Sequence, residues 1–200
     1  MDIQKYLEDG GLPENVTLVS HVNGDDEIAK FASICYGKED AQNKESLIKL
    51  LLTNGHTSVF EFANFTFRIK CPIFVARQWM RHRMGSYVEK SLRYTKAENF
   101  YIPEGTDAKQ LFDVAIRTSI SAYETLLAIG VKKEQARAVL PLSVMTEFYW
   151  NVNARSLMNF LKLRLDKHAQ LEIREYAQEI MNIFESKMPV TAKYFKEMIL

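Results

Sequence analysis

The stretch that decides the fold runs from Ala63 to Pro72 and reads ANFTFRIKCP. Apolar side chains occupy every second position, at Ala63, Phe65, Phe67 and Ile69. A period of two predicts a half-exposed strand with one apolar face. Pro72 closes this strand and can open a helix from Ile73, because proline suits the first helical position.

A second strand is predicted later in the chain by the same period. Its alternate positions are β-branched or aromatic, a composition typical of strands: Val144, Thr146, Phe148, Trp150 and Val152. The two strands are far apart in sequence, which allows antiparallel pairing. This favours an α+β fold over a repeated βαβ pattern.

The segments before and after the two strands carry apolar residues at helical intervals. The predicted helices span Glu45 to Asn54, Ala108 to Ile129, Val131 to Leu140, Ala154 to about Leu165, and a stretch with the stripe Ile173, Ala177, Ile180 and Phe184 that stops near Pro189. Gly55 and Gly130 mark two helix ends, and Asn153 can cap the helix that begins at Ala154. We predict a mainly antiparallel sheet flanked by long helices, in a single domain over residues 1–200.

Composition excludes several classes of protein. Of 200 residues, 47% are hydrophobic, so the chain can bury a core and disorder is not expected. No apolar run is long enough to span a membrane, and the first ten residues do not resemble a signal peptide. The only cysteines, Cys35 and Cys71, suit a reducing compartment, so we expect a cytoplasmic protein. A net charge of +1 argues against a general nucleic-acid coat.

Charge is segregated between Arg68 and Lys96. Eight basic residues occur there against one acid, Glu89, and they are interleaved with Trp79, Met80, Tyr87 and Tyr94. We expect Arg77 and Arg81 to share a helical face. A solvated basic face is the ordinary explanation of such a run. The aromatic residues favour a site for an anionic, aromatic ligand such as a nucleotide, because arginine binds phosphate oxygens bidentately.

A second polar group lies on or beside the apolar helix that begins at Ala154. It comprises Asn151, Asn153, Arg155, Asn159, Arg164 and His168. Arg155 and Asn159 are four residues apart, as are Arg164 and His168, so each pair is expected to share a face. A cap at Asn153 and a structural role for His168 are the simpler alternatives.

A third segment, Gly55 to Glu61, carries His56, Ser58 and Glu61 between a helix and the first strand. Its signal is weak when taken alone. The chain has neither a His-Glu-x-x-His motif nor a cysteine-histidine spacing for metal, so no metal site is expected.

Two motifs resemble one family. Arg81-His82-Arg83, seven intervening residues, then Ser91 and Arg93-Tyr94 is similar to the signature of the flavin-dependent thymidylate synthases. The run from Val152 to Phe160, VNARSLMNF, is a second independent match. The resemblance extends over most of the chain. It implies reductive methylation of dUMP to dTMP, with methylenetetrahydrofolate as carbon donor, NADPH as reductant and FAD as the bound cofactor.

The resemblance also implies site residues. At the flavin it implies His56, Ser58, Glu61, Arg81, His82, Arg83, Met84, Asn153, Arg155, Asn159 and Leu163. At dUMP it implies Gln78, Glu89, Ser91, Arg93, Tyr94, Arg137, Arg164 and His168. The expected catalytic residues are Ser91, Arg93, Arg164 and His56.

The family implies a homotetramer whose subunits complete each active site, with no nucleic-acid or membrane partner. Neither Cys35 nor Cys71 has the surroundings of an activated thiol, and Ser91 is assigned to orienting substrate because no general base adjoins it. The chain departs from the family at Val88, where asparagine is usual, and at Cys35, where serine is common. Two alternatives stay open: a nucleotide- or RNA-binding module, and an inactive flavin-binding relative.

Overall fold

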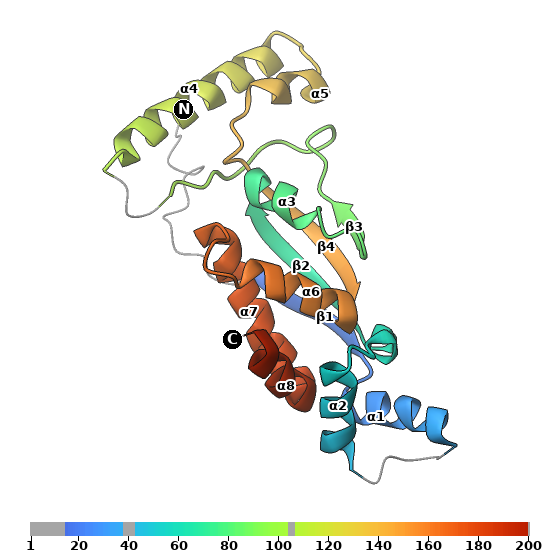
Figure 1. The fold of residues 1–200 in the computed structure, drawn as a ribbon. Helices are drawn as coiled ribbons and strands as arrows, with labels where there is room; N and C mark the ends of the chain where they lie inside the picture. The colour runs from blue at the N-terminus through green and yellow to red at the C-terminus, as the bar shows by residue number, and fades with distance from the viewer. Residues whose placement is uncertain (1–14, 38–42, 104–106, 200) are drawn as a thin grey trace. The chain divides into compact units, whose positions relative to one another are not determined.

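The computed structural model describes residues 15–37, 43–103 and 107–199. Four strands form one mainly antiparallel sheet in the order β1-β2-β4-β3 (Figure 1). Their bounds are Val16–Val22 for β1, Asn64–Pro72 for β2, Ser86–Glu89 for β3 and Met145–Asn153 for β4. The predicted α+β class with a mainly antiparallel sheet is confirmed.

Eight α-helices and three short 3-10 helices complete the described residues. The α-helices are α1 Asp25–Ser33, α2 Lys44–Thr53, α3 Ile73–Trp79, α4 Lys109–Ala128, α5 Lys133–Ala136, α6 Ala154–Arg164, α7 Leu171–Lys187 and α8 Pro189–Ile199. The 3-10 helices are η2 Ile34–Tyr36, η3 Ser58–Phe62 and η4 Arg137–Val139. Among the residues described, no helix combines the length and the hydropathy needed to cross a membrane.

The two period-two stretches form β2 and β4 with the predicted faces inward. Ala63, Phe65, Phe67 and Ile69 are fully buried, and so is Cys71 at the next inward position. In β4 the residues Phe148, Trp150 and Val152 are buried in the same way. The alternating apolar pattern was enough to predict both strands, because one face of each strand is buried and the other is not.

The chain forms two compact units. Unit 1 contains residues 69–79 and 88–148, and unit 2 contains residues 16–68, 80–87 and 149–200. The core of unit 1 gathers Ile116, Ile120 and Tyr123 of α4 against Phe100 and Val144. In this unit α4 contacts both α5 and η4.

Aromatic side chains build the core of unit 2. Phe65 of β2 packs edge-on against Phe184 of α7 with ring centroids 5.8 Å apart. Trp150 of β4 lies 5.8 Å from Phe67 and 5.0 Å from Phe160 of α6. Around this core α7 contacts β1, α6 and α8, so the face of each helix that carries these residues is buried.

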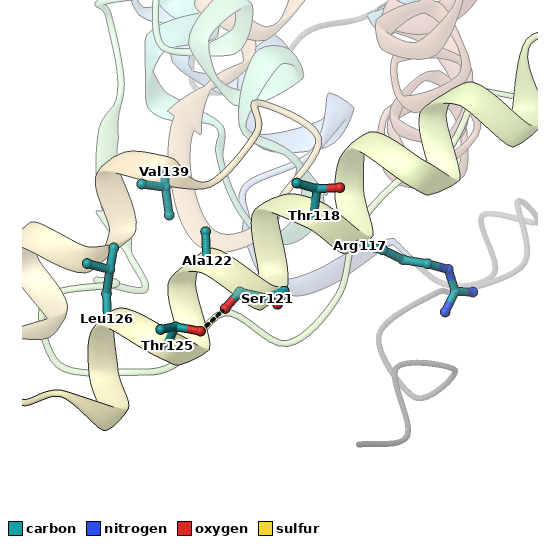
Figure 2. A pocket seen from close by; sticks show the side chains of 7 residues that line it. All are labelled: Arg117, Thr118, Ser121, Ala122, Thr125, Leu126 and Val139. Carbon is teal, nitrogen blue, oxygen red and sulfur yellow. Dashed lines mark hydrogen bonds between the residues drawn. The ribbon is translucent and has the colours of Figure 1, made fainter.

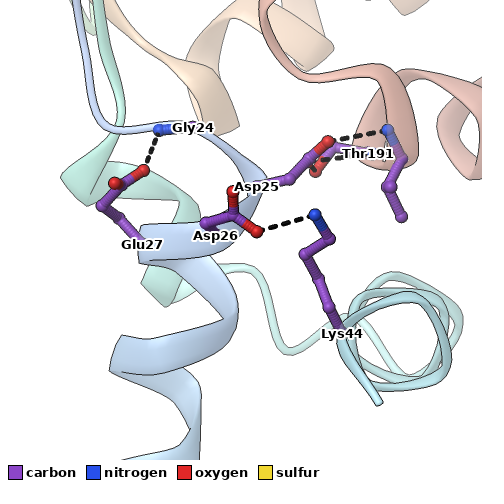
Figure 3. A network of polar contacts seen from close by, with 7 residues as sticks. Gly24, Asp25, Asp26, Glu27, Lys44 and Thr191 are labelled. Carbon is purple, nitrogen blue, oxygen red and sulfur yellow. Dashed lines mark hydrogen bonds and ion pairs between the residues drawn. The ribbon is translucent and has the colours of Figure 1, made fainter. Parts of the chain in front are cut away.

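A buried carboxylate joins α1 to α8 within unit 2 (Figure 3). Asp25 accepts hydrogen bonds from the backbone N–H groups of Val190 and Thr191 at 2.7 and 3.1 Å, and from Thr191 Oγ at 2.6 Å. These N–H groups belong to the first turn of α8 and have no partner within that helix. Asp25 therefore caps the N-terminus of α8, although it is distant from that helix in sequence.

Several boundaries differ from those expected. Helix α3 ends at Trp79, so Arg81 lies in the following turn and does not share a helical face with Arg77. Helix α6 ends at Arg164, which puts His168 outside it and separates that pair as well. The expected helix over Val131 to Leu140 is the shorter α5 followed by η4. Strands β1 and β3 were not predicted, and neither has one face buried throughout. Helices α1 and α8 were missed although they carry buried apolar residues at helical intervals, Ile28 and Ala32 in α1 and Ala192 and Phe195 in α8.

Candidate flavin and nucleotide site

A cavity of about 530 Å³ opens in unit 2 beside the start of α6. Two stretches of sequence line most of it. Residues Arg81 to Met84 come from the turn after α3, and Asn153, Arg155, Asn159, Leu163 and Arg164 come from β4 and α6. Four arginines and one glutamate, Glu61, stand on its lining, so the cavity is positively charged. The structure thus brings together nine of the eleven residues expected at the flavin.

The sequence explains why α6 presents these groups. Asn153 caps the helix, since its Oδ1 accepts a hydrogen bond of 2.9 Å from the backbone N–H of Ser156. Its side-chain NH₂ is then the part it can offer to a ligand. Arg155, Asn159 and Leu163 follow at intervals of four and lie on one side of α6, while Leu157 and Leu161 are buried on the other.

An aromatic wall backs the cavity. Trp150 lines it, and Tyr87 lies nearly parallel to Trp150 with centroids 6.3 Å apart. A Cβ at Gly85 would lie only 2.7 Å from Trp150 Nε1 and 3.0 Å from the carbonyl oxygen of Asn151. Only glycine lets the turn approach the indole this closely. Trp150 was predicted as a strand residue and not as part of a site.

His82 and Arg164 meet inside the cavity. Arg164 Nε donates a hydrogen bond of 3.0 Å to His82 Nε2, while the His82 ring packs edge-on to Phe160 at 4.9 Å. Burial, with the nearby charge of Arg164, lowers the pKa of His82 to about 4. The imidazole is therefore neutral near pH 7, with its proton on Nδ1, because Nε2 must keep its lone pair to accept.

Two further contacts shape this cavity. The hydroxyl of Tyr87 donates a hydrogen bond of 2.8 Å to the His82 carbonyl, and burial raises the pKa of Tyr87 to about 12. The Arg155 guanidinium pairs with the Glu61 carboxylate, which ties η3 to α6. Glu61 therefore positions Arg155 in addition to lining the cavity itself.

Three expected residues of unit 2 lie away from the cavity lining. His56 is exposed between α2 and η3, and Ser58 is exposed at the first position of η3. His168 is exposed beyond the end of α6, and its backbone N–H donates a hydrogen bond of 2.8 Å to Asp166 Oδ1. This geometry does not support the structural role considered for His168.

The remaining expected nucleotide residues belong to unit 1, where α5 organises three of them. Arg93 Nε and Nη2 both lie 3.3 Å from Glu134 Oε2. Arg137 Nε donates a hydrogen bond of 3.3 Å to the Glu134 carbonyl, and Lys133 Nζ lies 2.8 Å from the Tyr94 carbonyl. The sequence did not single out Glu134 or Lys133, because a Lys-Glu pair on a short helix is typical of any exposed surface.

Glu89 and Ser91 are also held by neighbours in unit 1. Thr146, a buried residue of β4, donates a hydrogen bond of 2.7 Å from Oγ1 to Glu89 Oε1. Ser91 Oγ accepts a bond of 3.3 Å from the Arg93 backbone N–H. Gln78 stands half-buried on α3.

The two cysteines and Val88 differ in exposure. Cys71 is buried in β2, and this burial raises the pKa of its thiol, so it stays protonated. Cys35 is exposed in η2. Val88 points outward from β3 with 71% of its surface exposed, so no packing demand accounts for an apolar residue there.

A second groove lies along α4 in unit 1 (Figure 2). Its two threonine hydroxyls bond within the helix, since Thr118 donates to the Val114 carbonyl and Thr125 to the Ser121 carbonyl, both at 2.8 Å. Its arginine, Arg117, pairs with Asp113 at 2.7 Å. None of the residues expected in a site lines this groove, so the arginine-rich cavity of unit 2 is the better candidate.

An α+β fold with an arginine-rich cavity is typical of a protein that binds an anionic ligand. Residues 17–190 match the family model described as thymidylate synthase complementing protein, Thy1. The chain belongs to this family.

Several named proteins are similar in sequence to nearly the whole of this chain. The flavin-dependent thymidylate synthase of Thermosipho africanus is 46% identical, with 96% of this chain and 92% of that protein covered. The enzyme of the same name from Pseudothermotoga lettingae is 44% identical over 90% of this chain and 89% of its own length. A solved structure of the UMP/dUMP methylase PolB from Streptomyces cacaoi, bound with 5-Br dUMP, matches with a TM-score of 0.86 at 30% identity, covering 91% and 94%.

Proposed function

We propose that this chain is a flavin-dependent thymidylate synthase that converts dUMP to dTMP by reductive methylation. One observation carries the proposal: the two motif segments, distant in sequence, supply most of the lining of one basic cavity. The family and the names of close relatives support the same reaction. The bound flavin is FAD in this proposal, methylenetetrahydrofolate supplies the carbon and NADPH the reducing equivalents.

The side chains of the cavity suit a flavin. Arg81, Arg83 and Arg155 can neutralise a pyrophosphate or donate to electron-rich ring atoms, and the buried Trp150 supports the inner side of the cavity. Bound FAD would supply hydride transfer to the substrate. Neutral His82 keeps a second positive charge away from Arg164, which leaves that guanidinium as the cation that faces the ligand.

We assign dUMP to the remaining expected residues. Arg93, Arg137 and Arg164 bind its phosphate and fix the position of the uracil. Gln78, Glu89, Ser91, Tyr94 and His168 complete the nucleotide site. His56 and Ser58 are assigned to the flavin, and Ser91 with His56 to the catalytic group, on the basis of their motif positions.

The proposal extends to assembly and location. Residues 1–200 act as one catalytic domain, and four copies form a homotetramer in which neighbouring subunits complete each site. Two cysteines without a disulfide between them are compatible with a cytoplasmic enzyme. Size-exclusion chromatography with light scattering tests the tetramer directly.

Flavin content tests the function most simply. Purified protein should be yellow, with the absorption of FAD, and should form dTMP anaerobically from dUMP, methylenetetrahydrofolate and NADPH. Colourless protein that FAD does not reconstitute would favour the alternative of a nucleotide- or RNA-binding module. Yellow protein without dTMP formation would favour the inactive relative, and Val88→Asn tests whether restoring the usual amide raises turnover.

A further inference from the structure

We infer that the Glu134 carboxylate is an internal counter-ion that occupies Arg93 until a nucleotide phosphate displaces it. This inference rests on the proposed function, because it takes the phosphate of dUMP as the displacing group. It adds a residue that neither motif contains. The geometry around α5 carries it.

Glu134 touches both arginines. Its carboxylate oxygen Oε2 faces Nε and Nη2 of Arg93, and its backbone carbonyl accepts from Arg137 Nε. The two arginines come from the turn after β3 and from the start of η4, yet they meet at one glutamate. Lys133 adds a third positive charge at the Tyr94 carbonyl. The carboxylate itself pairs with Arg93, while the side chains of Arg137 and Lys133 bind backbone carbonyls of Glu134 and Tyr94.

The Arg93–Glu134 contact is loose compared with its neighbours. One oxygen serves both N–H groups at 3.3 Å, whereas Lys90–Glu98 and Arg117–Asp113 of the same unit close to 2.7 Å. Two parallel bonds from Arg93 to separate phosphate oxygens would be shorter and stronger. Both side chains are also accessible, with 52% of Arg93 and 42% of Glu134 exposed, so an anion can reach the pair from solvent.

Such a counter-ion has a purpose in turnover. dUMP and dTMP carry the same phosphate, so an arginine pair that binds one tightly also retains the other. A carboxylate that competes for Arg93 weakens both complexes and speeds product release, because bound phosphate and Glu134 repel each other across the guanidinium.

Glu134→Gln tests this, since it removes the charge but keeps the size of the side chain. In the full-length protein loaded with FAD, titration calorimetry should show dUMP and dTMP binding about fivefold to tenfold tighter than in the wild type. Deoxyuridine, which lacks the phosphate, should be unaffected. Stopped-flow displacement should show slower dTMP release.

Asp113→Asn is the matched control, because it neutralises another paired carboxylate of unit 1 away from the expected site. It should leave dUMP affinity unchanged; equal tightening would mean a general charge effect and would overturn the inference. Unchanged or weaker dUMP binding in Glu134→Gln would overturn it too. Failure of the wild type to bind dUMP would instead contradict the proposed function.

Discussion

Arg164 and His82 are joined by a hydrogen bond of 3.0 Å between Nε and Nε2. One residue comes from the helix α6 and the other from the turn after α3, and their motif roles are nucleotide and flavin binding respectively. The contact uses the Nε–H of the guanidinium, and the His82 ring that accepts it packs edge-on against Phe160. A neutral histidine thus orients the cation.

Arg164→Ala is expected to weaken dUMP binding by about 2 to 3 kcal/mol, the scale of a charge-assisted contact left unmade. Titration calorimetry measures the change. Arg174→Ala is the control, because Arg174 is an arginine of α7 outside the cavity. Equal dUMP affinity in Arg164→Ala and wild type would contradict the assignment.

The low pKa of His82 predicts a loss of stability in acid. The unfolded histidine binds a proton near pH 6.5, but the folded one does so only near pH 4, so the free energy of unfolding falls as pH drops through this window. Because His82 is half-exposed, we expect about 1 to 2 kcal/mol.

Urea unfolding of the flavin-free protein at pH 7.5 and 4.5 measures this effect, with His82→Gln as the test variant. The glutamine can still accept a bond from Arg164 but does not titrate, so its stability should fall less in acid. The free energy of unfolding of His168→Gln, a variant at an exposed site, should fall in acid as much as that of the wild type. The same acid loss in all three proteins would exclude His82 as its source.

Gly85→Ala should reduce FAD affinity at least about tenfold, because the new methyl group would push the Trp150 indole out of the cavity wall. Quenching of flavin fluorescence reports the binding. Gly130→Ala provides the comparison, since it strains a backbone with φ of +87° in open space in unit 1. That variant should lose stability and keep its flavin; an unaltered flavin affinity in Gly85→Ala would rule out the close contact.

Asp25→Asn should destabilise the protein by about 2 to 3 kcal/mol, because an amide NH₂ replaces one of the two oxygens that accept bonds from α8. Asp26→Asn, the next residue, removes only an exposed ion pair with Lys44 and should change stability by less than about 0.5 kcal/mol. Chemical denaturation of both variants gives the comparison. Equal effects would show that burial of Asp25 does not matter.

Replacing both Cys35 and Cys71 by alanine should leave dTMP formation largely intact. Cys71 is buried with a raised pKa, and Cys35 lies on η2 outside the cavity, so neither can act as a nucleophile. The anaerobic assay measures turnover, and circular dichroism checks folding. A folded but inactive double variant would point to a thiol mechanism.

The alternation of β2 and β4 was readable in sequence because one face of each strand is buried, as Phe67 and Trp150 show. The spacing of Arg155 and Asn159 predicted their shared helical face, whereas the other cavity residues were implied only by the family resemblance. Contacts between segments that are distant in sequence could not be predicted. Nothing in the sequence indicates that Asp25 binds Thr191, 166 residues away, or that Glu134 meets Arg93.

The hydrogen bonds from α8 to Asp25 impose an order on biosynthesis. Unit 2 is assembled from residues 16–68, 80–87 and 149–200, whereas the stretch 88–148 of unit 1 is continuous. A ribosome must therefore translate past Thr191 before Asp25 finds its partners and the cavity-bearing unit closes. Until then β1 and β2 lack the helices that cover them, so their apolar side chains stay exposed. A chain stalled within α7 would therefore be a substrate for chaperones.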